Sequence, residues 1–314
     1  MFGKRDNLRL ISGNATKQLA QKIAVNLGTR LTDVTCEAFS DGELHVQIEE
    51  NIRGVDAFII QSTPSPAENL LELLLLIDAC KRSSADRVTA VLPYFGYARQ
   101  DRKDRPRVPI TAKLVANLLV GAGVDRVLTM DLHAPQIQGF FDIPLDHLLA
   151  APVLLNHVES MHLQPSCIIA PDVGSVKMAR AFAKRLGADL AIVDKRRAAP
   201  NVSESMNLIG DVEGKHAYIL DDMIDTAGTL VQAAELCSKM GALSVHATAT
   251  HAVLSGPAKQ RIDDSPIASL GVTNSLELDE SRMPEKCAVL DVSPLLGEAI
   301  RRIHNAESVS SLFV

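Results

Sequence analysis

The sequence has no tryptophan, few other aromatic residues and no long hydrophobic run. Its longest apolar run, over residues 70–77, is interrupted by Glu72 and is far shorter than the roughly 20 residues of a membrane-spanning helix. The first ten residues, MFGKRDNLRL, are charged and contain no apolar signal core. We therefore expect no membrane partner and no secretory signal, and we expect the protein to be cytoplasmic.

Cysteine is also scarce. The five cysteines are scattered along the chain and show neither CxxC nor zinc-finger spacing. An odd number of widely separated cysteines argues against a disulfide framework and indicates free, buried thiols in a reducing compartment. These residues are Cys36, Cys80, Cys167, Cys237 and Cys287.

The chain lacks an excess of positive charge. Its 32 Lys and Arg residues are outnumbered by 38 Asp and Glu residues, which gives a net charge of −6. This balance excludes a general nucleic-acid binder, so any site for anions must be local. The remaining composition is ordinary for a globular protein, with 46% hydrophobic and 22% charged residues. At roughly 100–200 residues per domain, a chain of this length favours two domains.

Short apolar segments alternate with segments of helical period. This alternation predicts an α/β protein with mainly parallel sheets flanked by helices. We expect two similar domains, 1–150 and 151–314, and the last helix, 294–305, could pack on either half. The expected strands are 57–61, 87–93, 126–130, 167–170, 190–193, 216–220 and 243–248. The expected helices are 68–82, 110–120, 175–186 and 228–240, with a polar loop over 193–210.

Two pairs of segments suggest that the halves are duplicates. Residues 121–134 (GAGVDRVLTMDLHA) and 241–252 (GALSVHATATHA) both run from Gly-Ala through a Val-started strand to His-Ala. Residues 56–70 and 216–230 are a second matching pair, in which only the later copy keeps an acidic, Gly-containing loop. Because βαβ units resemble one another by default, duplication and separate origin both stay open.

The strongest functional motif is AYILDDMIDTAGTL, residues 217–230. An apolar strand ends in Asp221 and Asp222, and Asp-Thr-Ala-Gly-Thr then opens a helix. Ligands bind at this edge of a parallel sheet, and backbone N–H groups of a small-residue loop at a helix start favour a phosphate. Two carboxylates suit neutral hydroxyls or a metal, so the motif predicts a sugar-phosphate site. The alternative is a plain helix cap with Asp225 as N-cap, which explains only one or two of these residues.

Six segments carry a family resemblance. They are FSDGE (39–43), LPYFGYARQDR (92–102), MDLHAPQIQGFFDIP (130–144), APDVG (170–174), VDKRRAAPNVSE (193–204) and ILDDMIDTAGT (219–229). In order and spacing they resemble the signature segments of class I ribose-phosphate pyrophosphokinases, also called phosphoribosyl pyrophosphate synthases. The resemblance implies two domains of phosphoribosyltransferase-like fold. It also implies an enzyme of nucleotide biosynthesis that transfers the β,γ-diphosphoryl group of ATP to the anomeric hydroxyl of ribose 5-phosphate, releasing AMP.

The resemblance assigns roles to individual residues. Lys195 and Arg197 are implied to be catalytic, which suits a reaction that moves negative charge between phosphates. A KRR run by itself is more often a solvated patch. The implied ribose 5-phosphate site comprises Arg197, Asp221, Asp222, Asp225, Thr226, Ala227, Gly228 and Thr229.

Magnesium is the implied cofactor. His133 and Asp172 are its implied ligands, although chemistry alone favours an oxygen ligand such as Asp172 and takes a lone His for a packed residue. The implied ATP-binding residues are Phe39, Asp41, Gly42, Glu43, Arg99 and Gln100.

Without the resemblance, the residues SDGE predict the tight turn of a hairpin. The alternating apolar residues Leu44, Val46 and Ile48 predict the strand that follows it. A hairpin tip has no pocket of its own, so a nucleotide bound there needs a second surface. In the family a neighbouring subunit provides that surface. The resemblance therefore implies a homo-oligomer, commonly a hexamer built from dimers.

Some residues depart from the family pattern. The basic loop 99–109 looks slightly short, and Asn51 stands where many members have Ser. Ser308 and Ser310 resemble the regulatory site. These departures leave activation by phosphate and inhibition by ADP open.

Two other functions share part of these features. A phosphoribosyltransferase shares the DDMIDTAGT-type loop, but it has one such domain and lacks the KRR and FSDGE segments. A non-catalytic partner of active synthases typically has altered catalytic loops, whereas Lys195, Arg197, His133 and Asp172 are all present here. The pyrophosphokinase is therefore the predicted function.

Overall fold

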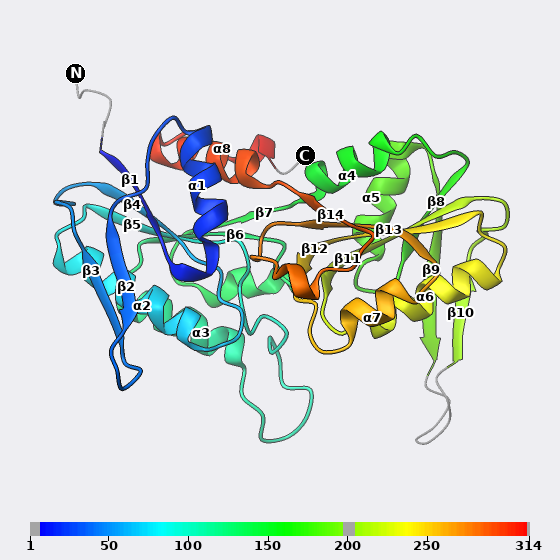
Figure 1. The fold of residues 1–314 in the computed structure, drawn as a ribbon, viewed down its shortest axis with the longest axis horizontal. Helices are drawn as coiled ribbons and strands as arrows, with labels where there is room; N and C mark the ends of the chain where they lie inside the picture. The colour runs from blue at the N-terminus through cyan, green and yellow to red at the C-terminus, as the bar shows by residue number, and fades with distance from the viewer. Residues whose placement is uncertain (1–6, 197–204, 313–314) are drawn as a thin grey trace. The chain divides into compact units, whose positions relative to one another are not determined.

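The computed structural model describes residues 7–196 and 205–312 of the chain. The chain divides into two compact units, each built around one main sheet. The first unit comprises Met1–Leu149, Ser275–Glu277 and Val292–Val314, and the second comprises Ala150–Asn274 and Leu278–Asp291. In both, helices flank a mainly parallel sheet, which confirms the predicted α/β fold (Figure 1).

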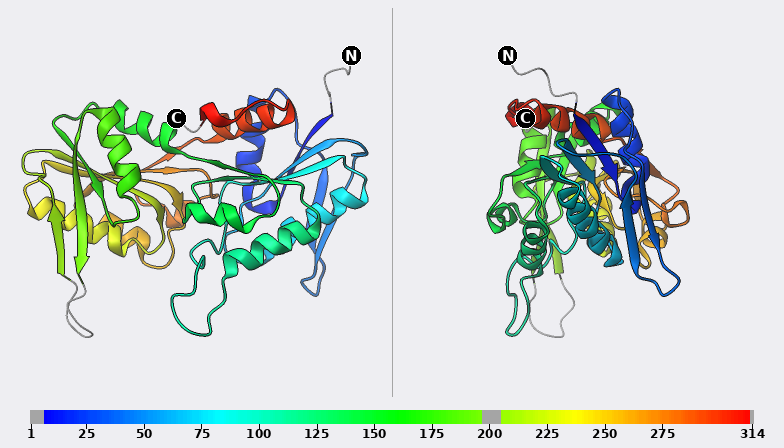
Figure 2. Two further views of the ribbon diagram at one scale, coloured as in Figure 1. Left: turned by 180° about the vertical axis from the view of Figure 1, so that it is seen from behind. Right: turned by 90° about the vertical axis from the view of Figure 1, so that its left-hand side faces the viewer.

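The sheet of the first unit has five parallel strands in the order β1-β4-β5-β6-β7. Helices α2 and α3 lie on one face, and α1 and α8 lie on the other (Figures 1 and 2). The strands are β1 (Leu8–Ser12), β4 (Asp56–Ile60), β5 (Arg87–Leu92), β6 (Arg126–Met130) and β7 (Leu145–Leu148), with a separate antiparallel hairpin of β2 (Val34–Ala38) and β3 (Leu44–Ile48). The helices are α1 (Lys17–Asn26), α2 (Glu68–Arg82), α3 (Thr111–Ala122) and α8 (Ser293–His304), with 3-10 turns at Asn14–Thr16, Pro135–Phe140 and Ser310–Leu312.

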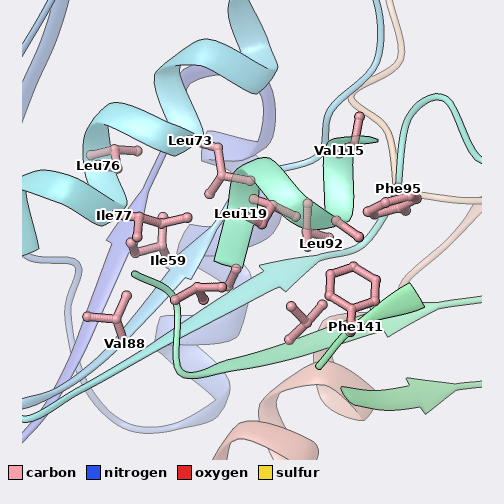
Figure 3. Close-up of a cluster of buried hydrophobic side chains, with 14 of the residues drawn as sticks. Ile59, Leu73, Leu76, Ile77, Val88, Leu92, Phe95, Val115, Leu119 and Phe141 are labelled. Carbon is pink, nitrogen blue, oxygen red and sulfur yellow. The ribbon is translucent and has the colours of Figure 1, made fainter. Parts of the chain in front are cut away.

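The core of this unit lies between the sheet and α2 and α3 (Figure 3). Strand β4 is buried along its whole length, as expected for a strand covered on both faces. Leu73, Leu76 and Ile77 of α2 recur at three- and four-residue spacing and form one face of that helix, which packs with Ile59 of β4. The apolar patterns of strand and helix thus fix this unit.

The sheet of the second unit has seven strands in the order β10-β9-β8-β11-β12-β13-β14. The edge strand β10 is antiparallel to β9, and the other neighbours are parallel. The strands are β8 (Ser166–Ala170), β9 (Asp189–Arg196), β10 (Ser205–Ile209), β11 (His216–Ile224), β12 (Ser244–Ala252), β13 (Ile267–Thr273) and β14 (Cys287–Leu290). The helices are α4 (Ala151–Ser160), α5 (Val176–Leu186), α6 (Gly228–Lys239) and α7 (Ala258–Asp263), with a 3-10 turn at Glu280–Arg282.

The two sheets repeat one topology. The parallel row β1-β4-β5-β6-β7 of the first unit has the same order as β8-β11-β12-β13-β14 of the second. In each row the first strand is followed by a helix and then by an antiparallel strand pair, β2–β3 or β9–β10. This order supports the similarity of the halves and the match of β4 with β11. It corrects the match of 121–134 with 241–252, because β6 is the fourth strand of its row and β12 is the third.

The helices that follow the two rows are exchanged between the units. Helix α4 follows β7 in sequence but packs on β12, β13 and β14 of the second unit. There the His157 ring lies so close to Gly271 that a Cβ added to this glycine would be 2.6 Å from it. Helix α8 follows β14 but packs on α1 of the first unit, where the Asn26 amide donates to the Ser293 hydroxyl at 2.8 Å. At both helices, the sheet that precedes the helix in sequence therefore belongs to the other unit.

A buried carboxylate fastens α8 to the first sheet. Asp56, at the start of β4, is 1% exposed. It accepts hydrogen bonds from the Arg87 guanidinium, and its carboxylate lies 2.7 Å from Nδ1 of His304 in α8. Arg87 also donates to the carbonyl oxygen of Ile303 at 3.1 Å. These contacts tie the last turn of α8 to β4 and β5.

The structure bears on the predictions about cysteines and membrane-spanning helices. All five cysteines are free, and three of them are buried, as predicted, whereas Cys36 and Cys287 are only partly buried. In the described ranges 7–196 and 205–312, no helix has the length and apolar character needed to cross a membrane.

Candidate active site

Two neighbouring strands of the second unit bring carboxylates to one edge of the sheet. Strand β8 pairs in parallel with β11, and Asp172 follows β8 while Asp221 and Asp222 lie in β11. Burial, a hydrogen bond with Asp222 and the charges of Asp222 and Asp172 raise the pKa of Asp221 well above its usual range. The Asp222 backbone N–H, which donates to the Asp221 carboxylate at 2.9 Å, acts in the opposite direction. Three carboxylates therefore converge here, which favours a cation or hydroxyl donors.

The strand that carries this pair is longer than the sequence indicated. The expected strand 216–220 continues through both Asp residues to Ile224, because Asp221 and Met223 pair with Ala249 and His251 of β12. Polar residues are tolerated at the end of a strand when a neighbouring strand satisfies the backbone.

The loop after β11 leads into α6 without a hydrogen bond from an N-cap side chain. Ala227 occupies the N-cap of α6 with a left-handed φ of +60°, so the first N–H groups of the helix receive no acceptor from an N-cap side chain. The interpretation of Asp225 as N-cap is wrong, because Ala227 occupies that position. The Asp225 carboxylate accepts a hydrogen bond from the Ser255 hydroxyl. Backbone N–H groups at such a turn, together with the helix dipole, form a concavity suited to a phosphate. Thr226, Gly228 and Thr229 lie in this same turn.

The loop after β8 turns back on Asp172. The Ser175 backbone N–H and hydroxyl donate to the Asp172 carboxylate at 2.9 and 3.1 Å. A Cβ added to Gly174 would lie 3.3 Å from that carboxylate, which leaves little room for a side chain. Asp172 is therefore oriented by its own loop at the start of α5 and stays exposed.

A cavity of about 510 Å³ lies beside this loop, between α5 and the β9–β10 strands. The basic residues Lys177 and Arg180 of α5 line this cavity and were not predicted from the sequence. Their three-residue spacing, which places two side chains on one face of a helix, was a usable signal. The lining residues are Val173, Val176, Lys177, Arg180, Ile192, Asp194 and Ile209.

One of the two predicted catalytic residues lies in a described element, near the end of β9. Lys195 lies in β9, where its backbone pairs with Met206 of β10. The expected loop 193–210 is therefore shorter, since strands occupy 193–196 and 205–209. Arg197 lies outside the described residues.

The predicted ATP segment 39–43 is the tip of the β2–β3 hairpin, as its turn pattern indicated. Gly42 has φ +95°, which an L-residue rarely adopts, and the Glu43 backbone N–H donates to the Asp41 carboxylate at 3.1 Å. Phe39 is 54% exposed, with its ring 5.1 Å from that of His45. An exposed ring at a hairpin tip is available for stacking on a base.

The remaining predicted residues are also in the first unit. Gln100 accepts a hydrogen bond from the Thr111 hydroxyl at the start of α3, and Arg99 beside it is exposed. His133 is exposed after β6, just past Asp131, whose φ is +38°. His133 belongs to the first unit and Asp172 to the second.

The carboxylates of the second unit fit magnesium in kind. Mg²⁺ takes oxygen ligands, retains waters and is usually held by one or two carboxylates together with substrate phosphates. Throughout the described part of the chain, no group of three or more His, Cys, Asp or Glu residues is placed to hold a metal ion. Exposed Asp172 beside the crowded Asp221 and Asp222 thus fits an ion that arrives with phosphate rather than a permanently caged one.

Comparison with known proteins decides the family. The N-terminal domain model of ribose phosphate pyrophosphokinase matches residues 8–123, and the phosphoribosyl synthetase-associated domain model matches residues 196–314. Ribose-phosphate pyrophosphokinase of Chlorobaculum tepidum is 58% identical, covering 98% of this chain and 95% of the relative. The Bacillus subtilis enzyme is 53% identical, covering 98% and 97%. This chain belongs to the ribose-phosphate pyrophosphokinase family.

The fold agrees with a solved pyrophosphokinase. The crystal structure of phosphoribosylpyrophosphate synthetase from Mycobacterium smegmatis has a TM-score of 0.91 and 42% identity to this chain. The match covers 96% of this chain and 100% of that one. The resemblance of the six sequence segments to ribose-phosphate pyrophosphokinases is confirmed at the level of the family, and so is the phosphoribosyltransferase-like fold that it implied.

Proposed function

We infer that the protein is a ribose-phosphate pyrophosphokinase that makes phosphoribosyl pyrophosphate from ribose 5-phosphate and ATP. The observation that carries this inference is a family match over nearly the whole chain. The carboxylate pair of β11 and the open helix start at Ala227 support it, because one sugar phosphate needs both a hydroxyl acceptor and a phosphate cradle.

We propose that the second unit holds ribose 5-phosphate. The 5-phosphate would lie on the backbone N–H groups of 225–229 at the N-terminus of α6, with the Thr226 and Thr229 hydroxyls as further donors. Asp221 and Asp222 would accept hydrogen bonds from the ribose hydroxyls, at a distance from the phosphate charge. Asp225, fixed by Ser255, would hold the loop shape.

The reaction forms a bond between the anomeric oxygen of the sugar and the β-phosphorus of ATP. The bond from that phosphorus to the oxygen it shares with the α-phosphate breaks, AMP leaves with that oxygen, and the attacking hydroxyl loses its proton. Negative charge shifts onto AMP, so cations near the leaving group lower the barrier. We propose Lys195 and Arg197 for this role, since a compact ammonium and a forked guanidinium suit different phosphate oxygens.

We propose that ATP binds through residues of the first unit. Phe39 would stack on adenine, and Asp41 and Glu43 beside the Gly42 turn would accept hydrogen bonds from its amino group. Arg99 would contact phosphate, and Gln100 would contact the base or a phosphate.

The finer assignments are also proposals. We assign the protein to class I, with Mg²⁺ as the cofactor, Asp172 as a ligand and His133 as the second ligand that the resemblance implies. A bound Mg²⁺ would neutralise phosphate charge. We further propose a cytoplasmic hexamer, with inorganic phosphate and ADP as candidate regulators acting near Asn51, Ser308 and Ser310. The Asn51 side chain accepts from the Arg53 backbone N–H at 3.0 Å, so a Ser there would change this turn.

AMP formation by the purified protein tests the function. AMP should appear with ATP, Mg²⁺ and ribose 5-phosphate together, in step with phosphoribosyl pyrophosphate, and omission of any component should abolish it. A parallel series with inorganic phosphate tests regulation. Failure to form AMP under all of these conditions, with ATP still bound, would favour a non-catalytic partner instead.

A matched pair of variants tests the proposed catalytic lysine. Lys195→Ala should lower turnover by about 100-fold or more, because a cation that neutralises transition-state charge is lost. Lys184→Ala, which removes an exposed lysine from the last turn of α5, should leave turnover near that of the parent. Thermal unfolding should occur at similar temperatures in all three proteins. Normal turnover of Lys195→Ala would remove this residue from the mechanism.

A further inference from the structure

The segment that follows β12 donates hydrogen bonds to the turn 225–229, which is the proposed phosphate site. The Val253 and Leu254 backbone N–H groups donate to the Ile224 carbonyl oxygen at 2.9 and 3.0 Å, and the Ser255 N–H donates to the Asp225 carbonyl at 3.0 Å. The Ser255 hydroxyl also donates to the Asp225 carboxylate. These contacts fix the first half of the turn.

Arg261 of α7 fixes the second half. Its Nη1 donates to the Thr226 carbonyl oxygen at 3.0 Å. The same nitrogen lies 3.6 Å from the position that a Cβ of Gly228 would occupy. One guanidinium therefore reaches from the middle of the turn to the first residue of α6.

The peptide geometry gives this contact a consequence. In a planar trans peptide, the C=O and the following N–H point in opposite directions. Arg261 holds the Thr226 carbonyl toward α7, and therefore directs the Ala227 N–H to the other side of the turn. A carbonyl oxygen turned into the cradle would repel a phosphate, whereas an N–H attracts it.

The charge of Arg261 acts in the same direction. A guanidinium beside the N-terminus of α6 adds to the positive end of the helix dipole. Its fork also allows one nitrogen to hold the carbonyl while the others stay available, which a lysine ammonium does less well.

We propose that Arg261 is a positioning residue that sets the affinity of this turn for the 5-phosphate of the sugar substrate. The proposal rests on the assignment of residues 225–229 to ribose 5-phosphate. Arg261 acts through the Thr226–Ala227 peptide and takes no part in the bond changes at the β-phosphorus. Its loss should therefore weaken ribose 5-phosphate binding selectively.

Steady-state kinetics and calorimetric titration with ribose 5-phosphate alone test the proposal on the intact protein. Arg261→Gln should raise the KM and the Kd for ribose 5-phosphate by about tenfold or more, the effect of losing one charge-assisted hydrogen bond. The KM for ATP, kcat and the thermal midpoint should change little. Arg261→Lys, which keeps the charge, should fall between the two. Lys239→Gln, which removes one charge from the far end of α6, should match the parent protein.

Two results would overturn the proposal. One is an unchanged KM and Kd for ribose 5-phosphate in Arg261→Gln. The other is an equal rise in KM for both substrates with a lower thermal midpoint, which indicates a merely structural role. Because calorimetry needs no turnover, absence of AMP formation by the parent protein would count against the proposed function and leave this test intact.

Discussion

The second strands of the two parallel rows, β4 and β11, occupy the same place in the fold and end in opposite environments. Gln61 and Ser62, directly after β4, are fully buried, whereas Asp221 and Asp222 in β11 are partly exposed. The Gln61 amide donates to Glu72 at 2.9 Å and accepts from the Ala15 backbone N–H at 3.1 Å. One topology therefore supports a closed polar network in the first unit and an open edge in the second.

The closure of the first unit is steric as well as polar. A Cβ on Gly13 would lie 2.4 Å from the Gln61 side chain. The loop after β1 can therefore come this close to Gln61 only with a glycine at position 13. The Ser62 hydroxyl is likewise engaged, since it donates to the Ser275 carbonyl oxygen at 2.7 Å. The comparison teaches that ligand chemistry depends on whether the polar groups at the end of this strand are buried or partly exposed.

The largest effect should come from the open edge. Asp222→Asn should lower kcat/KM for ribose 5-phosphate by about 100-fold or more, because the proposed sugar site loses a carboxylate that accepts hydrogen bonds from the ribose hydroxyls. Its partly exposed position predicts little change in thermal midpoint. Asp264→Asn, an exposed carboxylate on the same unit, is the control for AMP formation. Equal turnover of the two variants would break the comparison.

Removal of the Asp56 carboxylate should have the largest effect on stability. Asp56→Ala should lower the free energy of unfolding by about 3–5 kcal/mol, because it leaves Arg87 and His304 without their buried partner. Glu50→Gln, which breaks a partly exposed pair with Arg30, should cost less than about 1 kcal/mol. Urea unfolding compares the two, and similar midpoints would show that Asp56 does not anchor α8.

The closed network should behave as structure and not as a site. Gln61→Leu should cost about 2–3 kcal/mol, because Glu72 and the Ala15 N–H lose a buried partner. Turnover per folded molecule should stay within about threefold of the parent, unlike that of Asp222→Asn. The assay is AMP formation normalised to the folded fraction. A loss of turnover with normal stability would place a ligand in the first unit.

The smallest effect concerns acid stability of α8. Arg301 and Arg302 lower the pKa of Glu298 to about 2 through hydrogen bonds. A carboxyl with a depressed folded pKa stabilises the fold above its unfolded pKa of about 4.3, and this contribution is lost as pH falls toward 2. Because the pair is partly exposed, Glu298→Gln should cost at most about 1 kcal/mol at pH 5 and less at pH 3. Urea midpoints measure this, with Glu68→Gln as control, and an equal cost at both pH values would contradict it.

Much of the fold follows from local pattern. Helix α2 and strand β6 begin and end where the sequence predicted, because most of their apolar residues recur at the spacing of a helix and of a buried strand. The hairpin at 39–43 was predictable from Gly42 between alternating strands. The motif at 217–230 was visible in the sequence too, since its carboxylates, small residues and hydroxyls are consecutive, and its role as a sugar-phosphate site stays a prediction.

Other features depend on partners distant in sequence. Strands β9 and β11 extend through polar residues because β10 and β12 pair with them, which no apolar count reveals. Arg261 lies 35 residues from Thr226 of the turn that it contacts, so no local sequence pattern predicts this contact. The destination of α8 also depended on tertiary contacts with α1 and Asp56.

The exchange of α4 and α8 has a consequence for synthesis. Domains generally fold as they emerge from the ribosome, N-terminal part first. Here the first unit must wait for Ser293–His304, which is translated after every strand of the second. Until then the face of α1 that receives α8 is uncovered, and the second unit can close first. The part of the chain made earliest is thus completed last.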